Sequence, residues 1–254
     1  MIRISSEGLI SKTVIADRID LDFDLVHLAD QSTCLQYGDV HVYCAAVTPL
    51  LELSPTMLDV LSDDERTKKL RFFREADANR FLVGRGLLRL LLSKYLGRSA
   101  DQFRFTYGSF GKPTLNHSLQ FNVSHSDSLI LVAFAWNNQI GADIERIDAN
   151  IDILELAAQF FGGQEYHHLR SLGGVYRERA FYRFWTQKEA CVKATGFGMR
   201  ELHRQISGKE MLLNSLLEQP WVDFPNSECR VIELSLHADY CASIAIGPTL
   251  VEGT

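Results

Sequence analysis

Predicted helices and strands fall into blocks along this chain, and this order constrains the fold class more than any other feature of the sequence. Ser54-Pro55 reads as an N-cap followed by proline at the first helical position, and 62–65 reads as a capping box. Apolar residues at helical spacing predict a long helix from Glu75 to Tyr95, with Gly97 placed to end it. Strand-like runs lie at 40–47, 103–107, 120–123, 129–136 and 139–145.

The second half of the chain again offers helices together with strands. Helical patterns run over 151–161, 164–171 and 175–195, and strand-like runs return at 229–237 and 240–246. Asn137-Asn138 predicts a tight hairpin turn between two of the earlier strands. Helices and antiparallel strands in both halves predict an α+β fold and are compatible with a duplicated architecture. The segments 1–38 and 205–228 carry no clear pattern.

Composition narrows the classes of function. With 254 residues, 46% of them hydrophobic, the chain can bury a substantial core, and no apolar run reaches membrane-spanning length. The N-terminus lacks the basic start and apolar run of a signal peptide, and the five cysteines are scattered without a C-x-x-C spacing. We therefore expect a soluble cytoplasmic protein with reduced thiols, no membrane partner and no zinc knuckle.

Charge is distributed unevenly along the chain. The net charge of −6 argues against nucleic acid as a partner. Positive side chains are nevertheless concentrated in 65–97, whereas many acids lie in 18–30 and 142–156. A locally basic region on an acidic protein suits a compact anionic ligand.

Two carboxylates stand two residues apart on one predicted strand. Asp143 and Glu145 leave the same face of that strand, about 6–7 Å apart at the backbone. Two anions on a covered face need a counter-charge. They are either the exposed acidic end of a strand, with Arg146 nearby, or part of a cation site.

A third carboxylate lies in the predicted helix that ends before Gly196. Trp185, Glu189 and Val192 fall on one side of this helix, which places an acid within an apolar stripe. Lys193, four residues after Glu189, would pair with it in a simple surface ion pair. Alternatively, oxygen ligands from two strand carboxylates and one helix carboxylate suit Mg²⁺, which also binds substrate phosphates.

Another set of polar residues lies near the end of the first half of the chain. Lys112 precedes Pro113 and is held extended, and Ser124-His125-Ser126 after a predicted strand offers hydroxyl, imidazole and backbone donors to an anion. His125 is equally compatible with a satisfied core histidine. The surrounding residues do not form the G-x-S-x-G turn of a serine nucleophile.

These stretches, in this order, resemble the Sfp-type (surfactin-synthetase-activating) 4'-phosphopantetheinyl transferases. The family pattern is matched by Gly111-Lys112-Pro113, 122–126, 141–145 and 185–193, and the resemblance runs from about residue 55 to 200. The basic segment from Lys68 to Arg80 looks like the family's basic entry segment. Two departures are Ala142, where a branched aliphatic residue is usual, and Asp127, where glycine is frequent; Asp127 adds negative charge near the expected phosphate site.

The resemblance implies a monomer of two similar α+β subdomains related by a pseudo-twofold, 1–137 and 138–254, with the cofactor cleft between them. Magnesium would be held by Asp143, Glu145 and Glu189. Coenzyme A would be bound by Lys68, Arg80, Lys112, Pro113, Ser124, His125 and Lys193. The catalytic residues implied are Lys193, at the pyrophosphate, and Glu165, as the general base.

The activity that the resemblance implies is transfer of the 4'-phosphopantetheine moiety of coenzyme A to a serine of an acyl, peptidyl or polyketide carrier protein, with release of 3',5'-ADP. Two alternatives are a metal-dependent phosphoesterase acting on coenzyme A and a non-catalytic module that binds coenzyme A and a carrier protein. The sequence does not say which carrier protein or pathway is served, or whether free or acylated coenzyme A is preferred. Glu165 has a solvated helix position as its alternative, and the roles of Lys188, Phe197 and Met199 stay open between function and structure.

Overall fold

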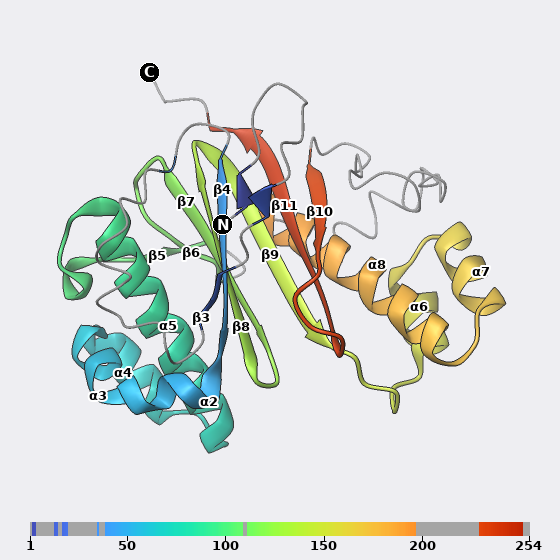
Figure 1. Cartoon of the computed structure of the whole chain (residues 1–254), viewed down its shortest axis with the longest axis horizontal. Coiled ribbons are helices and arrows are strands. Elements are labelled where there is room, and N and C mark those ends of the chain that lie inside the picture. Colours follow the sequence, from blue (N-terminus) through green and yellow to red (C-terminus); the bar gives the residue numbers. More distant parts are fainter. Residues whose placement is uncertain are drawn as a thin grey trace.

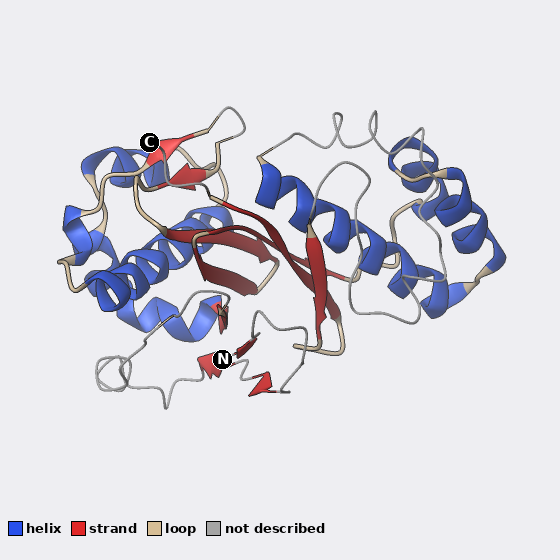
Figure 2. Ribbon diagram, turned by 90° about the horizontal axis from the view of Figure 1, so that it is seen from above, coloured by secondary structure: helices blue, strands red, loops and turns tan. Residues whose placement is uncertain are grey.

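The computed structural model describes residues 2–3, 13–14, 17–19, 35, 39–108, 111–196 and 229–250. Helices and strands occur in both halves, which confirms the predicted α+β class. Figures 1 and 2 show the main strands in the centre, with one group of helices at each end of the molecule. None of the helices in these ranges combines the length and apolar character needed to cross a membrane.

The first sheet has four strands in the order β3-β4-β8-β7. These are β3 (Asp17–Ile19), β4 (Val40–Ala46), β8 (Leu129–Trp136) and β7 (Leu119–Ser126). The β3–β4 pair is parallel and the other two pairs are antiparallel. One face packs against helix α5 (Glu75–Leu96) in a core that includes Leu88, Leu92, Phe121 and Phe134.

Short helices surround α5 in this half. They are α2 (Val47–Leu50), η1 (Leu51–Leu53), α3 (Ser54–Val60), α4 (Asp63–Leu70) and η2 (Ala100–Gln102). Two further pairs of very short strands are β1 (Ile2–Arg3) with β2 (Thr13–Val14) and β5 (Thr106–Tyr107) with β6 (Pro113–Thr114).

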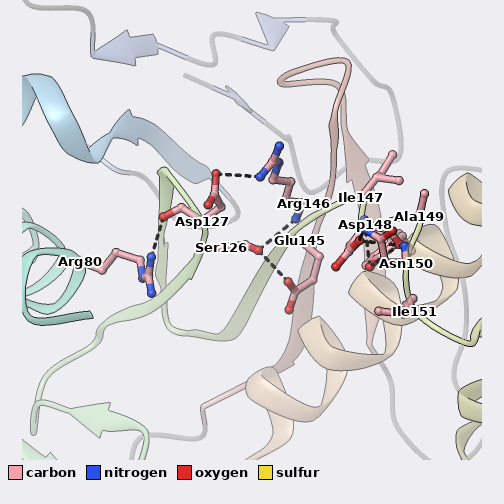
Figure 3. A pocket seen from close by; sticks show the side chains of 11 residues that line it. Arg80, Ser126, Asp127, Glu145, Arg146, Ile147, Asp148, Ala149, Asn150 and Ile151 are labelled. Atoms are coloured by element: carbon pink, nitrogen blue, oxygen red, sulfur yellow. Dashed lines mark hydrogen bonds and ion pairs between the residues drawn. The ribbon is translucent and has the colours of Figure 1, made fainter. Parts of the chain in front are cut away.

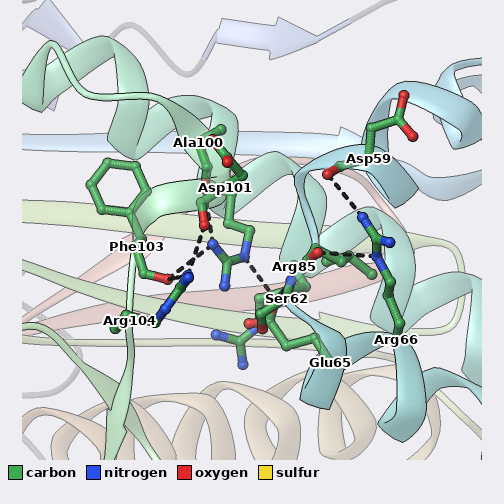
Figure 4. Close-up of polar contacts among 11 residues, drawn as sticks. Asp59, Ser62, Glu65, Arg66, Arg85, Ala100, Asp101, Phe103 and Arg104 are labelled. Atoms are coloured by element: carbon green, nitrogen blue, oxygen red, sulfur yellow. Dashed lines mark hydrogen bonds and ion pairs between the residues drawn. The ribbon is translucent and has the colours of Figure 1, made fainter.

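A buried ion pair joins α4 to α5 and to η2 (Figure 4). Arg89 Nε donates to Glu65 Oε2 at 2.7 Å, and its Nη1 donates to the carbonyls of Ala100 and Phe103. The backbone N–H of Ser62 donates to the same Glu65 oxygen at 3.1 Å, as the predicted capping box requires. Glu65 and Arg89 are each 1% exposed, so this pair is a structural element of the first half rather than a surface contact.

The second sheet has three antiparallel strands in the order β10-β11-β9. These are β10 (Arg230–Leu234), β11 (Tyr240–Thr249) and β9 (Asn138–Arg146). Helix α8 (Gly174–Thr195) packs on one face, together with α6 (Ile153–Phe160) and α7 (Gly163–Ser171). The other faces of the two sheets meet in a shared core that includes Val42, Leu131, Ala142 and Ile144.

Three local predictions are wrong in ways that packing explains. The turn at Asn137, which has a φ of 59°, does not close a hairpin, because β8 pairs with β4 and β7 while β9 pairs with β11. The chain therefore passes from one sheet to the other there. Ser54 lies inside α3 rather than capping it, since the N-cap is Leu53. Strand character over 103–107 is confined to Thr106–Tyr107, because Phe103 instead enters the core.

Candidate active site

The close approach of helix α8 to strand β9 builds the centre of the site. A Cβ atom on Gly141 would lie 1.9 Å from the carbonyl oxygen of Ala190 and 2.4 Å from the backbone nitrogen of Ala194, so only glycine fits between these backbones. Glu189 and Lys193 each stand one position before these alanines. The contact therefore brings both side chains beside Asp143, two residues further along β9.

Side chains of β7 attach this strand to β9 of the other sheet. Asn122 Oδ1, Ser124 Oγ and Ser126 Oγ accept hydrogen bonds from the backbone N–H groups of residues 142, 144 and 146, at 3.1, 3.4 and 3.0 Å. Residues two apart on a strand share a face, so every second side chain of β7 from 122 to 126 bonds every second backbone N–H of β9 from 142 to 146. We call this set of bonds the side-chain ladder. Asn122 was not predicted as a site residue and Ser126 was named only as part of the Ser-His-Ser triplet, although this two-residue spacing is visible in the sequence.

Asp143 is the most enclosed of the three predicted carboxylates, with 2% of its surface exposed. Its Oδ1 accepts from Lys193 Nζ at 2.5 Å and from Ser124 Oγ at 3.0 Å. Its Oδ2 is buried and has no hydrogen-bond partner among the described residues. Burial raises the pKa of Asp143 in spite of Lys193 and Ser124. The lysine thus pairs with Asp143, and the predicted surface pair with Glu189 is not formed.

Glu145 and Glu189 complete the group of acids. Burial and the charge of Asp143 raise the pKa of Glu145 to about 7, although Ser126 Oγ donates to its Oε2 at 2.8 Å. Burial, and to a lesser extent Asp143, also raises the pKa of Glu189. The three side chains that were predicted as metal ligands are therefore close enough to repel one another. The alternative of an exposed acidic strand end is wrong, because Asp143 is buried and Glu145 is half-buried.

The donor set fits a hard divalent cation. One buried carboxylate oxygen lacks a partner among the described residues, and burial followed by the charge of neighbouring acids raises the pKa of Glu145 and of Glu189. All the donors are carboxylate oxygens, which Mg²⁺ prefers. Among the described residues, no three His, Cys, Asp or Glu side chains already converge at metal-binding distances. The structure thus supplies the acids but not a finished coordination shell.

An open pocket of about 690 Å³ lies beside this group (Figure 3). Arg80 reaches it from α5, Glu145 from the end of β9 and Tyr182 from α8, and 147–151 line the rest of one side. Arg80 Nη1 donates to the carbonyl of Asp127 at 3.2 Å, and its Nη2 pairs with Asp77. One pocket is therefore lined both by Arg80, a predicted contact of the phosphates, and by Glu145, a predicted metal ligand.

Asp127 adopts the conformation that glycine takes most readily, with a φ of 48°. This explains why glycine suits the position, and the carboxylate here pairs at 3.5 Å with Arg146. The negative charge that was expected to disturb the phosphate site is thus partly offset.

The remaining predicted cofactor contacts divide into two sets. Lys68 is exposed, with its ammonium group 5.3 Å from the ring centre of Phe81. His125 lies inside β7, not after it as predicted, and is exposed; the surrounding protein and then Arg80 lower its pKa. Both side chains are exposed, although neither of them lines the pocket.

The second set is engaged inside the protein. Lys112 Nζ donates to the carbonyls of Ile140 (2.9 Å) and Lys193 (2.6 Å), and burial lowers its pKa to about 8. Pro113 pairs with Tyr107 in the short β5–β6 sheet. The Ser124 hydroxyl donates to Asp143 and accepts from Ile144 N–H and from Lys193, which uses its full hydrogen-bonding capacity.

Glu165 lies in a separate buried ion pair. Its Oε2 accepts from the backbone N–H of Gly162 at 2.8 Å and lies 2.9 Å from Lys188 Nζ. Glu165 is 2% exposed and Lys188 1%, and Lys188 also lies over the ring of Phe161. The solvated helix position that was the alternative for Glu165 is therefore wrong, and Lys188 is its buried partner. Phe197 and Met199 lie outside the described residues.

The raised pKa of Glu145 predicts a pH-dependent stability when divalent cations are absent. The folded state keeps the Glu145 proton up to a pH of about 7, whereas the ordinary value is 4.5. Between these values the folded protein binds more protons than the unfolded chain, so this group makes unfolding easier as pH rises through that window. Urea unfolding of the wild type and of Glu145→Gln in EDTA should show a smaller loss of stability in the variant. Equal slopes for both proteins would contradict the pKa assignment.

Two family models match consecutive parts of the chain. A model of the N-terminal part of 4'-phosphopantetheinyl transferases matches residues 48–137, and a model of the 4'-phosphopantetheinyl transferase superfamily matches residues 139–245. The second matched region contains β9, α8 and all three carboxylates.

Curated relatives carry related names. The chain is 43% identical over 147 residues to the 4'-phosphopantetheinyl transferase HetI of Nostoc sp., with 56% of this chain and 62% of the relative covered. It is 39% identical over 160 residues to the putative 4'-phosphopantetheinyl transferase slr0495 of Synechocystis sp., covering 61% and 64%. Sfp of Bacillus subtilis, also named a 4'-phosphopantetheinyl transferase, is 31% identical over 150 residues, covering 58% and 66%. The matched region thus spans less than two thirds of each relative.

Proposed function

Because the chain belongs to the 4'-phosphopantetheinyl transferase superfamily, we propose that it transfers the 4'-phosphopantetheine moiety of coenzyme A to a serine of an acyl, peptidyl or polyketide carrier protein and releases 3',5'-ADP. The observation that carries this proposal is the group formed by Asp143, Glu145, Glu189 and Lys193, which the Gly141 contact assembles beside an open pocket.

Asp143, Glu145 and Glu189 would hold Mg²⁺. The partnerless Oδ2 of Asp143 and the raised pKa values of the acids support this assignment. A bound Mg²⁺ would supply charge neutralisation at the pyrophosphate, where negative charge grows on the leaving 3',5'-ADP as the phosphoanhydride bond breaks. Lys193 lies at the same place and would contribute its own positive charge to the pyrophosphate.

Arg80, His125 and Lys68 would bind the phosphates of coenzyme A. Arg80 already faces the pocket, and its guanidinium group can make charge-assisted hydrogen bonds to a phosphate. Lys112 and Ser124 instead hold β9 and the end of α8, so their main contribution would be to position the ligands around them. Direct contact of coenzyme A with Lys112, Pro113 or Ser124 stays a prediction.

The attacking group would come from the carrier protein, whose serine hydroxyl must lose a proton. Glu165 remains our candidate for the general base. In the present structure its carboxylate is tied to Gly162 and Lys188, so this role requires those contacts to open when the carrier binds.

We further propose two similar subdomains, 1–137 and 138–254, that form a monomer. The passage of the chain from one sheet to the other at Asn137 and the covering of each sheet by its own helices support this boundary. The net charge of −6 disfavours a nucleic-acid partner. A cytoplasmic location stays a prediction from the sequence.

The test is intact-mass spectrometry of an apo carrier protein incubated with this protein, coenzyme A and Mg²⁺. We expect a mass increase of one phosphopantetheine group on the carrier, and no increase when EDTA is present. Release of phosphopantetheine into solution without labelling of a carrier would support the phosphoesterase alternative. Coenzyme A binding without either product, across fatty-acid, polyketide and peptidyl carriers, would support the non-catalytic module.

Replacing Arg80 with alanine is expected to raise the KM for coenzyme A about 10- to 100-fold with a smaller change in kcat, because a charge-assisted phosphate contact made in the ground state is lost. Arg66→Ala is a suitable control, since Arg66 donates to the carbonyls of Asp59 and Leu61 at the end of α3 and does not line the pocket. Steady-state kinetics at saturating carrier protein measure both constants. An unchanged KM in Arg80→Ala would remove Arg80 from the ligand site.

A further inference from the structure

We propose that the Ser126 hydroxyl is a positioning group for Glu145, and that it prepares this carboxylate to bind a divalent cation. The inference rests on the proposed function, since it concerns a ligand of the same metal site. Ser126 lies at the end of β7, next to the open pocket that Glu145 also lines (Figure 3).

The hydrogen bonds of Ser126 fix the direction of its single O–H donor. Its Oγ accepts the backbone N–H of Arg146 at 3.0 Å, as the last bond of the side-chain ladder. The hydroxyl proton is then donated to Glu145 Oε2 at 2.8 Å. A hydroxyl carries one donor, so a backbone bond on the oxygen side leaves the proton for the carboxylate alone. The position of β9 thereby determines where the proton points.

This bond restricts the rotation of the Glu145 side chain. Ser126 Oγ lies 2.8 Å from Glu145 Oε2 and is itself bonded to the backbone of β9. A cation ligand binds best when few rotamers are available to it before the ion arrives. The Ser126 bond supplies this constraint from a neighbouring strand. Among the described residues, no hydroxyl group donates a hydrogen bond to Glu189 on α8.

The same ladder contains a matched internal control. Asn122 Oδ1 accepts the backbone N–H of Ala142 at 3.1 Å, and its side chain forms no hydrogen bond with the three carboxylates within the described part of the chain. Asn122→Ala therefore removes one ladder bond of similar length and leaves the acids untouched. Ser126→Ala removes one ladder bond and the bond to Glu145 together. The difference between the two variants isolates the contribution of the hydroxyl to the carboxylate.

The experiment measures Mn²⁺ binding by electron paramagnetic resonance in the full chain with coenzyme A present, together with thermal unfolding. We expect the Mn²⁺ dissociation constant to rise about 10-fold or more in Ser126→Ala, by the usual effect of a lost outer-shell partner. Asn122→Ala should lower the unfolding temperature by a similar amount to Ser126→Ala without changing the Mn²⁺ constant. Ser126→Thr keeps the hydroxyl and should restore wild-type binding.

Kinetics provide a second readout. In Ser126→Ala the Mg²⁺ concentration for half-maximal transfer should rise by the same factor as the Mn²⁺ constant, while kcat at saturating Mg²⁺ stays close to the wild-type value. A loss caused by unfolding alone would lower kcat without shifting the Mg²⁺ requirement.

Several outcomes would overturn the inference. These are wild-type Mn²⁺ affinity in Ser126→Ala, an equal loss of Mn²⁺ affinity in Asn122→Ala, or no recovery of Mn²⁺ affinity in Ser126→Thr.

Failure of the proposed function has a different signature. If the wild type binds Mn²⁺ in a Ser126-dependent way but labels no carrier protein, the inference stands and the transferase proposal falls. If the wild type labels a carrier without binding Mn²⁺, the metal site and this inference both fall.

Discussion

Gly141→Ala is expected to destabilise the fold by about 3 kcal/mol or more and to abolish transfer, because the added methyl group has no free volume to enter. Its Cβ would lie 1.9 Å from the Ala190 carbonyl oxygen and 2.4 Å from the Ala194 nitrogen, which are backbone atoms of α8 and cannot rotate away. The helix would have to move, and Glu189 and Lys193 would move with it.

Urea unfolding and carrier labelling measure the two effects of this substitution. Gly163→Ala is the matched control, because nothing lies within 4 Å of its Cβ position and the residue starts helix α7. Alanine there should change stability by less than about 1 kcal/mol, and in the favourable direction. If Gly141→Ala behaved like Gly163→Ala, the close packing of α8 on β9 would be wrong, and so would the geometry of the acids.

Asp143→Asn is expected to reduce transfer about 1000-fold while leaving the protein folded. The substitution removes the charge from the most buried acid of the group, whose second oxygen has no partner in the described structure. Loss of several kcal/mol of charge stabilisation at the leaving group corresponds to this factor. Stability should stay within about 1 kcal/mol, since the cost of burying the carboxylate disappears with the ion pair and Lys193 can still be hydrated.

The measurement combines the initial rate of carrier labelling with an unfolding curve for each protein. Asp239→Asn, at the exposed turn between β10 and β11, serves as the control and should keep the wild-type rate. A rate in Asp143→Asn within a few fold of the wild type would remove Asp143 from the metal assignment. A folded variant that binds coenzyme A normally and does not transfer would support it.

Local sequence patterns were sufficient for elements that depend on neighbouring residues. The helix starting at Glu75, its end at Gly97 with a φ of 62°, and the strand Leu129–Trp136 are confirmed. Each is determined by spacing, a cap or β-branched content within its own segment. The two-residue spacing of Asp143 and Glu145 likewise predicted that the two side chains lie near each other, and the charge of Asp143 does act on Glu145.

The same local patterns could not predict which strands and helices, far apart in the sequence, pack against each other. The Asn137 turn is present, but the strands on either side of it belong to different sheets, because the choice of neighbour depends on packing of the whole sheet. Strand β7 extends to Ser126, because its residues pair with β8 up to the Ser126–Leu129 position, and a local pattern does not reveal that neighbour. The burial of Glu165 with Lys188 depends on two helices meeting, which neither helix encodes alone.

The side-chain ladder has a mechanical consequence. Its three bonds cross from one sheet to the other at the point where two of the acids are held, so any hinge motion that opened the sheets would first disassemble the acids. Separation of the two halves would therefore move the carboxylates apart, and a cation bound between the carboxylates would favour the closed arrangement. A ligand is then expected to enter through the open pocket, past Arg80 and 147–151, while the contact between the two sheets is kept throughout turnover.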